Sequence, residues 1–543
     1  MTIEINSGSD LLYFIRDLDS GNEGYADANV ILTANISVGD FFPIGYYAPQ
    51  SPVVPFNGTF DGNGHTISGN LVGIDNENFP VNKVGIIAVL GSAGIVKNLN
   101  VTCSVSGRVD GNVGGIVGEN NGGTVTNCTF SGSVSGSGNV GGIVGQNNGG
   151  SVTDCTNSGG VSGKGNVGGV VGDNSGSVTN CTNDVDFGLS GSGNNFGGVV
   201  GNNSGSVTGC SNNGRISVPM TNPPSSASGN LGGVVGQNSG ADARITSCYN
   251  IGDLCNDFPS GSFDGNLGGV VGNNSDNSSV TNSYNTGTIG VSNVPLVSGT
   301  VGGVVGSNSG NSSVTNCYNS GKFGSFINST VGGVIGSNTD TSNVTNCYFL
   351  QQDNVPAQGI GSGETTGATP VDDLTKQEQF SDWDFANTWR ISQSLGFPVL
   401  QENAQDGLPP GLGTEASPYR ISTADELKSF RDIVNDVDGN ADGNPAAHAE
   451  LMNDIDLSSI CNETNPWEPI GNGGGTSGGN TFEGYFDGQG HSVKNLVVGF
   501  EKHVAGASCF SKPFYFIGER AQTTENFFRL WLEETQPTTI KHY

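Results

Sequence analysis

Short apolar pieces of two to four residues recur along most of the chain, separated by glycine, asparagine and serine. The clearest unit is a phrase of the type Val-Gly-Gly-Ile/Val-Val-Gly-x-Asn, repeated every 27 to 36 residues. Its glycine pairs begin at Gly114, Gly141, Gly168, Gly197, Gly232, Gly268, Gly302 and Gly332. A weaker ninth copy covers Val84–Ala88. About ten residues after each pair comes a Val-Thr-Asn-Cys phrase, and then a third apolar position such as Val134. Each period therefore holds three short β-prone pieces.

Pieces this short cannot bury a face alone, so their regular return favours stacked repeats over separate domains. A period of ~27 residues at ~3.3 Å per residue suits one turn of a three-sided coil. Stacking such coils pairs every strand with its counterparts above and below, at ~4.8 Å per rung, so nine rungs predict a rod of roughly 40 Å. The longer periods gain residues mainly before the next glycine pair, as between Pro219 and Gly229, which predicts one edge where insertions bulge out.

The recurrent glycines and asparagines have a mechanical interpretation. A glycine pair permits a bend with positive φ, where a Cβ would clash. The asparagine that ends the phrase can bond to its counterparts in adjacent coils, and we predict a ladder that fixes the register of stacking. It is present in all eight full copies, at Asn120, Asn147, Asn174, Asn203, Asn238, Asn274, Asn308 and Asn338.

Seven of the 11 cysteines occupy one position of the repeat. They are Cys128, Cys155, Cys181, Cys210, Cys248, Cys317 and Cys347. Leu99 and Ser283 take the same place in other copies, so we predict a small interior position filled by free thiols. Side chains in register point the same way, which disfavours disulfides between coils, and no cysteine or histidine spacing suits zinc.

The two flanks of the chain repeat each other. Residues 56–65 match 482–491, both containing Phe-Asp-Gly-Asn/Gln-Gly-His, and residues 5–11 match 421–427. Each copy opens with an amphipathic stretch, at 10–17 and at 425–434. We predict helices there, with the initial aspartate as N-cap and the helix covering the end of the solenoid.

These observations divide the chain into six segments. We predict an N-terminal cap and first coils at 1–83, repeat coils at 84–349, an aromatic closing cap at 350–402, a linker at 403–411, a truncated second copy of the N-terminal unit at 412–500 and a divergent tail at 501–543. The second copy has a preceding segment that the first lacks, which suggests that sequence upstream, such as a signal peptide, is missing. The glycine-poor tail suggests a change of reading frame.

The charge pattern bears on partners. The formal net charge is −31, which argues against nucleic acid and anionic membranes. Residues 351–500 carry 23 acidic and 6 basic side chains, whereas residues 100–350 carry 12 and 5, so the repeats are nearly neutral. No apolar run approaches the ~18 residues of a membrane span, and no N-terminal secretory signal is present.

The glycine-pair phrases, the Val-Thr-Asn-Cys phrases and the two Phe-Asp-Gly-Asn/Gln-Gly-His openings resemble the GLUG-motif repeat proteins of bacterial and archaeal surfaces, over roughly residues 1–500. The resemblance implies an all-β, right-handed parallel β-helix of the pectin-lyase-like type. It also implies a secreted or cell-surface location and adhesin-like roles. Some relatives carry a metallopeptidase, but this chain has no His-Glu-x-x-His, and the family offers no catalytic residue to transfer.

Three functions stay open. The first is a non-catalytic adhesin or spacer that binds an extracellular glycan or surface protein, without a cofactor, catalytic residue or metal ligand, and with binding residues unknown. The second is a carbohydrate-active enzyme, which needs two carboxylates facing one cleft. Its candidates are Glu119, Asp154, Asp173, Asp186, Asp61 and Asp487, with His65 and His491 beside the last two. The third is a calcium-dependent module, because Asp438–Gly443 resembles half of an EF-hand loop, although position 12 is Ala449.

Overall fold

The computed structural model describes most of the chain. The described residues are 1–21, 24–45, 54–72, 82–107, 111–188, 195–217, 227–255, 263–290, 297–326, 329–380, 382–392, 395–401, 408–409, 411, 413–415, 417–435, 444–462, 465–467, 470–471, 482–497 and 516–517. They form two compact units, Met1–Asp373 and Leu374–Tyr543, and each is considered by itself.

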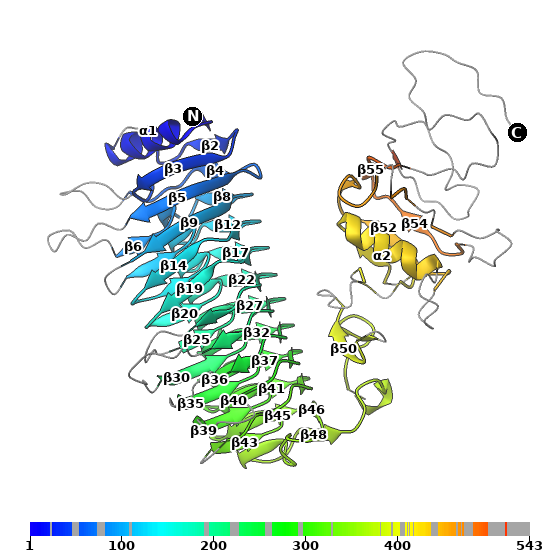
Figure 1. Cartoon of the computed structure of the whole chain (residues 1–543). Coiled ribbons are helices and arrows are strands. Elements are labelled where there is room, and N and C mark those ends of the chain that lie inside the picture. The colour runs from blue at the N-terminus through cyan, green and yellow to red at the C-terminus, as the bar shows by residue number, and fades with distance from the viewer. Residues whose placement is uncertain are drawn as a thin grey trace, which may run out of the picture. The chain divides into compact units, whose positions relative to one another are not determined.

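The first unit is a right-handed parallel β-solenoid of about 12 turns, as Figure 1 shows from β2 down to β48. Four long sheets run along it, named here by the phrases that build them. The Val-Gly sheet comprises β6 (Lys83–Val84), β10 (Asn112–Gly114), β15 (Val140–Gly141), β20 (Asn166–Gly168), β25 (Asn195–Gly197), β30 (Ala227–Gly232), β35 (Phe263–Gly268), β39 (Val297–Gly302) and β43 (Ser329–Gly332). The Gly-x-Asn sheet comprises β7 (Ile87–Leu90), β11 (Val117–Asn120), β16 (Val144–Asn147), β21 (Val171–Asn174), β26 (Val200–Asn203), β31 (Val235–Ser239), β36 (Val271–Ser275), β40 (Val305–Asn308), β44 (Ile335–Asn338) and β47 (Ile360–Gly363).

The other two long sheets follow in each coil. The Val-Thr sheet comprises β1 (Thr2–Ile5), β2 (Asn29–Leu32), β4 (Thr59–Asp61), β8 (Ile95–Lys97), β12 (Thr124–Thr126), β17 (Ser151–Thr153), β22 (Ser177–Thr179), β27 (Ser206–Thr208), β32 (Arg244–Thr246), β37 (Ser279–Thr281), β41 (Ser313–Thr315) and β45 (Asn343–Thr345). The Cys sheet comprises β3 (Ile36–Phe41), β5 (Thr66–Val72), β9 (Asn100–Ser106), β13 (Thr129–Phe130), β14 (Ser133–Gly136), β18 (Thr156–Asn157), β19 (Gly160–Gly163), β23 (Thr182–Asn183), β28 (Ser211–Asn212), β33 (Tyr249–Asn250), β38 (Tyr284–Asn285), β42 (Tyr318–Asn319), β46 (Cys347–Leu350) and β48 (Ala368–Val371). A short sheet joins β24 (Phe187–Gly188), β29 (Ile216–Ser217) and β34 (Leu254–Cys255).

The predicted coil of three strands was wrong in its count. Each glycine-pair phrase supplies two strands, one before and one after the bend, such as β10 and β11. The period was right: Val117 pairs with Val144, 27 residues later, and Val134 pairs with Val161 in the same register. The predicted nine rungs were too few, because three strands precede β8 in the twelve-stranded Val-Thr sheet. At ~4.8 Å per strand that sheet spans ~50 Å.

The reason given for the glycine pairs was also wrong. Gly114 and Gly115 do not have φ values in the left-handed region, and neither do Gly141 and Gly142. What excludes a side chain is the next coil: a Cβ on Gly115 would overlap the carbonyl oxygen of Gly142. Glycine is therefore needed because neighbouring coils approach closely at the bend, not because the bend requires positive φ.

A helix covers the N-terminal end, as predicted. Helix α1 (Gly8–Asp19) buries Leu11, Phe14 and other apolar residues in the same core as the first coils. Its N-cap is Ser7 rather than the predicted Asp10. The Ser7 hydroxyl accepts from the Asp10 backbone N–H at 3.3 Å, while the Asp10 carboxylate accepts from the Asn6 N–H at 3.1 Å. This reciprocal arrangement is a variant of the capping box, in which the acidic side chain three residues after the N-cap accepts from the residue before the N-cap.

The insertion loops, including Pro219, lie outside the described residues. The strands on either side of them keep their register. Ile216 in β29 pairs with Leu254 in β34, and Asn230 in β30 pairs with Asn266 in β35.

The second unit contains a small version of the first coils. Strands β51 (Tyr419–Ile421), β52 (Ala449–Leu451) and β54 (Phe486–Asp487) form one parallel sheet; β53 (Ile455–Asp456), β55 (Ser492–Lys494) and β56 (Phe516–Ile517) form another, in which β56 runs antiparallel. Helix α2 (Ala424–Asn435) begins after Thr423, whose hydroxyl accepts from the Glu426 N–H at 3.2 Å. Apart from β56, the predicted tail at 501–543 lies outside the described residues.

Aromatic residues gather near the start of the second unit, beside the 3-10 helix η1 (Gln377–Gln379) and the hairpin of β49 (Trp389–Ser392) and β50 (Phe397–Leu400). The rings of Trp383 and Trp389 stack with centroids 4.3 Å apart. Arg390 donates to the carbonyl oxygens of Pro409 and Gly411 at 3.0 and 3.1 Å. These contacts lie within the second unit, so the role of this segment as a closing cap for the first unit stays a prediction.

Candidate functional site

The asparagines of the Gly-x-Asn sheet form the predicted ladder. The side-chain Nδ2 of Asn120 donates to Oδ1 of Asn147 at 2.8 Å, and the same bond joins every following pair of coils. The further pairs are Asn147–Asn174, Asn174–Asn203, Asn203–Asn238, Asn238–Asn274, Asn274–Asn308 and Asn308–Asn338, at 2.7 to 2.8 Å. All eight side chains are buried, so their amides are committed to the interior of the rod.

A second buried asparagine ladder was not predicted. It lies two residues after the cysteine position and joins Asn157, Asn183, Asn212, Asn250, Asn285 and Asn319, with Nδ2–Oδ1 distances of 2.7 to 2.8 Å. Each of these amides also donates to a backbone carbonyl two residues later, as Asn212 does to Gly214 at 2.8 Å. The signal was present in the sequence, because asparagine recurs at this spacing behind the cysteines.

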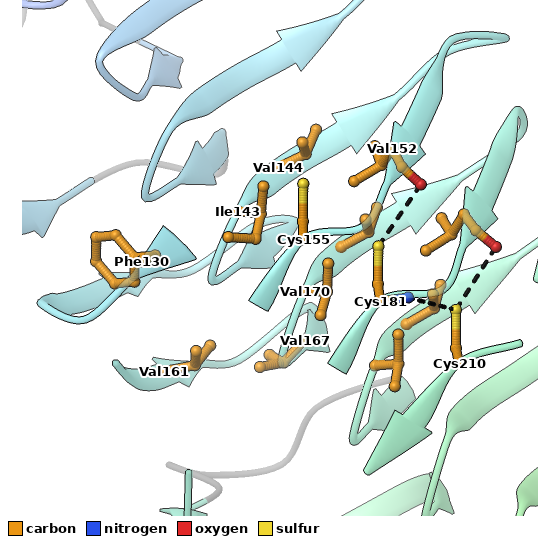
Figure 2. Packing of buried hydrophobic residues seen from close by; sticks show 14 of the residues in the cluster. Phe130, Ile143, Val144, Val152, Cys155, Val161, Val167, Val170, Cys181 and Cys210 are labelled. Atoms are coloured by element: carbon orange, nitrogen blue, oxygen red, sulfur yellow. Dashed lines mark hydrogen bonds between the residues drawn. The ribbon is translucent and has the colours of Figure 1, made fainter. Parts of the chain in front are cut away.

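The cysteines form the predicted interior column. Figure 2 shows Cys155, Cys181 and Cys210 on successive coils among buried valines. All seven are free and buried, and each Sγ donates to the carbonyl of the threonine two residues earlier at 3.2 to 3.4 Å. Ser283 reproduces this bond at 2.9 Å. Burial raises the pKa of the Cys181 and Cys248 thiols well above the ordinary value, so these groups are poor nucleophiles.

The residue before each cysteine holds the corner between the Val-Thr and Cys sheets. Asn127 has φ 51°, Asp154 53° and Asn180 53°, and six further coils have asparagine, serine or glycine in the same left-handed conformation. Asparagine and aspartate tolerate this region better than other residues with a Cβ. Asp154, one of the catalytic candidates, therefore occupies a position that the backbone conformation explains.

The remaining candidate carboxylates of the repeats are bonded to neighbours. Glu119 and Asp173 lie in one column of the Gly-x-Asn sheet, two coils apart, with Gln146 on the coil between them. Lys83 Nζ lies 3.0 Å from Glu119, and Gln146 Nε2 donates to Asp173 at 3.1 Å. Asp186, on another part of the coil, accepts from a backbone N–H at 2.7 Å. Each of these three carboxylates is therefore held by an ammonium, amide or backbone N–H group of the coil.

The two aspartates of the duplicated openings stabilise turns. Asp61 accepts from the Asn63 N–H at 2.9 Å, and Asp487 from the Gln489 N–H at 3.0 Å. Burial by itself would raise the pKa of Asp61, but hydrogen bonds from Asn63, Asn98 and Lys97 outweigh it and hold the pKa below its ordinary value. An ionised, fully bonded carboxylate suits a turn rather than a proton donor.

The calcium candidate gains no support. Asp438–Gly443 lies outside the described residues. Within the part of the chain that the structure describes, no three histidine, cysteine or carboxylate side chains come together as a metal site. His491 lies 3.7 Å from Asp454, whose other partners are Ser492 and Lys494.

A known sequence motif matches several of the coils. A sequence model described as "The GLUG motif" matches residues 110–135, 264–290, 298–323 and 327–350. The first match begins at the Val-Gly sheet and runs to β14, which is nearly one complete coil. The chain contains GLUG motifs at four repeat positions. The coils between the matched ones stack in the same register, so each motif corresponds to one turn of the solenoid.

Two further comparisons place the GLUG coils among known proteins. Halomucin of Haloquadratum walsbyi is 40% identical over 97 residues, which is 18% of this chain and 1% of halomucin, so the chain spans only a small part of that relative. The crystal structure of a proposed immunoglobulin A1 protease from Bacteroides ovatus aligns over 73% of this chain and 91% of that one, at 17% identity. Its TM-score of 0.28 is too low for us to infer shared fold or chemistry.

Neither helix in the described ranges has the length and apolar character that crossing a bilayer would require.

Proposed function

We propose that this chain is a non-catalytic repeat module of a secreted or cell-surface protein, acting as an adhesin or a structural spacer. The observation that carries the proposal is that the repeated polar residues are bonded to one another inside the rod. Both asparagine ladders and the thiol column join coil to coil, and the carboxylates considered for catalysis have structural partners. A long stack of this kind suits many weak contacts or a fixed separation.

The six segments predicted from the sequence belong to this proposal. In it, residues 84–349 form the extended surface between the N-terminal cap at 1–83 and the aromatic closing cap at 350–402. The linker at 403–411 then leads to the truncated second copy at 412–500 and the divergent tail at 501–543. An extracellular setting is consistent with the acidic chain and with the GLUG repeats, and the ligand is a glycan or a surface protein.

The test separates binding from catalysis. Purified full-length protein should bind glycans, matrix proteins or whole cells in a pull-down and release no soluble product from them. A polyuronate incubated with the protein should show no increase in reducing ends. If product formed, and if Glu119→Gln or Asp173→Asn abolished it while Asp154→Asn did not, the enzyme hypothesis would replace this proposal.

A further inference from the structure

The outward side of the Val-Thr sheet carries two columns of small polar side chains over eight successive coils. Each strand from β12 to β45 buries its central valine or isoleucine and points the residues on either side outward. The first column is Thr124, Ser151, Ser177, Ser206, Arg244, Ser279, Ser313 and Asn343. The second is Thr126, Thr153, Thr179, Thr208, Thr246, Thr281, Thr315 and Thr345. We call these sixteen residues the hydroxyl face.

The hydroxyl face is in register throughout. Thr126 pairs with Thr153, Thr153 with Thr179, and the alignment continues to Thr345. Neighbouring coils are therefore ~4.8 Å apart along a column, and the two columns are ~6.6 Å apart across a strand. All eight threonines of the second column are partly exposed, so their hydroxyls lie at the surface of the rod.

The hydroxyls of this face are largely without protein partners, which distinguishes it from the other sides of the coil. Among the described residues, its side-chain bonds are Ser151–Thr153 and Asn343–Thr345, both at 3.0 Å. The Gly-x-Asn sheet instead ties its outward polar groups together, as Asn202 does with Asp173 at 2.7 Å. On the Cys sheet, Tyr284 is fully buried and stacks on the next ring at 5.0 Å.

Amides border the hydroxyl face along its second column. The left-handed corner residue that follows each threonine is an asparagine in five coils, at Asn127, Asn180, Asn282, Asn316 and Asn346. The side-chain Oδ1 of Asn316 is buried and has no hydrogen-bond partner among the described residues. A buried acceptor without a donor is uncommon in folded proteins, and this one lies at the corner that borders the second column.

The chemistry of the hydroxyl face limits what it can bind. Arg244 is its one charged side chain, in a chain of net charge −31, so neither nucleic acid nor a charged glycan is favoured. It has no aromatic or large aliphatic side chain of the kind that anchors protein interfaces. Hydroxyls and amides in a straight, evenly spaced row match a partner that presents hydroxyls at short, regular intervals.

We propose that the hydroxyl face binds a linear, uncharged polysaccharide lying along the rod. The proposal rests on the adhesive function above and names its ligand class. Each coil contributes one or two hydrogen bonds that replace bonds to water, so a single contact is weak. Eight coils in register make the contacts additive, because after the first sugar residues bind, the next are held close to their partners.

The test uses the full chain in native gels cast with galactomannan, with hydroxyethyl cellulose or, as the charged comparison, with polygalacturonate. The variant is Thr126→Val, Thr153→Val and Thr179→Val together, which removes three hydroxyls but keeps β-branched side chains that suit a strand. The matched control is Thr129→Val, Thr156→Val and Thr182→Val, three threonines on the Cys sheet of the same coils. Unchanged circular dichroism of both variants shows that the solenoid is intact.

We expect at least one of the two neutral polysaccharides to retard the protein, and the hydroxyl-face variant to raise the dissociation constant by about ten-fold or more. The control should bind as the natural chain does. Equal loss in both variants, or no loss in either, would overturn the assignment of the face. Retardation only by polygalacturonate, or binding only to surface proteins, would refute the ligand class while leaving the adhesive function standing. Absence of any binding to cells, glycans or proteins would remove the adhesive function itself.

Discussion

The asparagine ladder of the Gly-x-Asn sheet gives the sharpest stability prediction, at Asn203 in the middle of the solenoid. Asn203 is fully buried and accepts from Asn174 at 2.7 Å while donating to Asn238 at 2.8 Å and to the Gly205 carbonyl at 3.0 Å. Replacing it with alanine leaves a donor on one coil and an acceptor on the next without their partner. Each buried group left unsatisfied costs about 1–3 kcal/mol, so Asn203→Ala should cost roughly 2–6 kcal/mol locally.

Its neighbour supplies the control. Asn202 points outward from the same strand and makes one side-chain bond, to Asp173 at 2.7 Å. Asn202→Ala removes as many atoms but leaves no buried group unpaired, so its cost should stay within about 1 kcal/mol.

Hydrogen exchange followed by mass spectrometry is the suitable assay, because a repeat array can open locally without unfolding as a whole. A loss of about 3 kcal/mol corresponds to roughly 100-fold faster exchange in the coils around residues 174–238. Asn203→Asp should be worse than alanine at neutral pH, since a buried carboxylate cannot donate to Asn238, and it should recover in acid. If Asn203→Ala and Asn202→Ala exchange alike, the ladder does not stabilise the stack.

Four further predictions follow from individual positions. Gly142→Ala should destabilise the solenoid by about 1–3 kcal/mol because its Cβ would overlap the carbonyl of Gly169, whereas Gly160→Ala, with no atom within 4 Å, should be nearly neutral in urea denaturation. The column thiols should resist Ellman's reagent until the chain is unfolded, and rapid reaction in the native state would contradict the packing. The variant Cys155→Ser should still fold, because Ser283 occupies the same position of the repeat and makes the same hydrogen bond. Burial raises the pKa of Cys103 from 9.0 to about 12, so the native thiol stays protonated at pH values where the unfolded thiol ionises. The free energy of unfolding should therefore fall as the pH rises above 9, and it should fall less steeply in Cys103→Ser. In the second unit, hydrogen bonds from Ser492 and Lys494 hold the pKa of Asp454 at about 2. The stability that this carboxylate contributes at neutral pH should therefore be lost between about pH 4 and 2, and Asp454→Asn should flatten the dependence of stability on pH in that range.

The period and the interior positions were predictable because they depend on residue type at a fixed spacing. The asparagine of Gly-x-Asn and the cysteine of Val-Thr-Asn-Cys recur in nearly every copy, and stacking in register converts recurrence directly into contact. The second ladder, at Asn157 and its counterparts, follows the same logic, because asparagine recurs two residues after the cysteine position in most copies.

Other features could not be read from the residues. A glycine pair is compatible with positive φ and with close approach of another coil, since both exclude a Cβ, and only coordinates separate the two. For the same reason, the sequence did not show that each glycine-pair phrase forms two strands, one before and one after the bend. At the helix start, Ser7 and Asp10 both suit an N-cap, and the capping box uses both. The hydroxyl face was not predicted, because its significance lies in which hydroxyls lack partners, and this depends on the packing of every other side.

The central claim is that successive phrases are successive turns of one stacked coil. Pulsed electron paramagnetic resonance between spin labels tests it most directly, with one label at Ser151 and the other at Ser279, Ser313 or Asn343, which lie four, five and six strands away in the Val-Thr sheet. Backbone separations of ~19, ~24 and ~29 Å are expected, rising by one strand spacing per coil. Distances that fail to rise in equal steps, or that shorten for the more distant pair, would show that the phrases are not stacked in register.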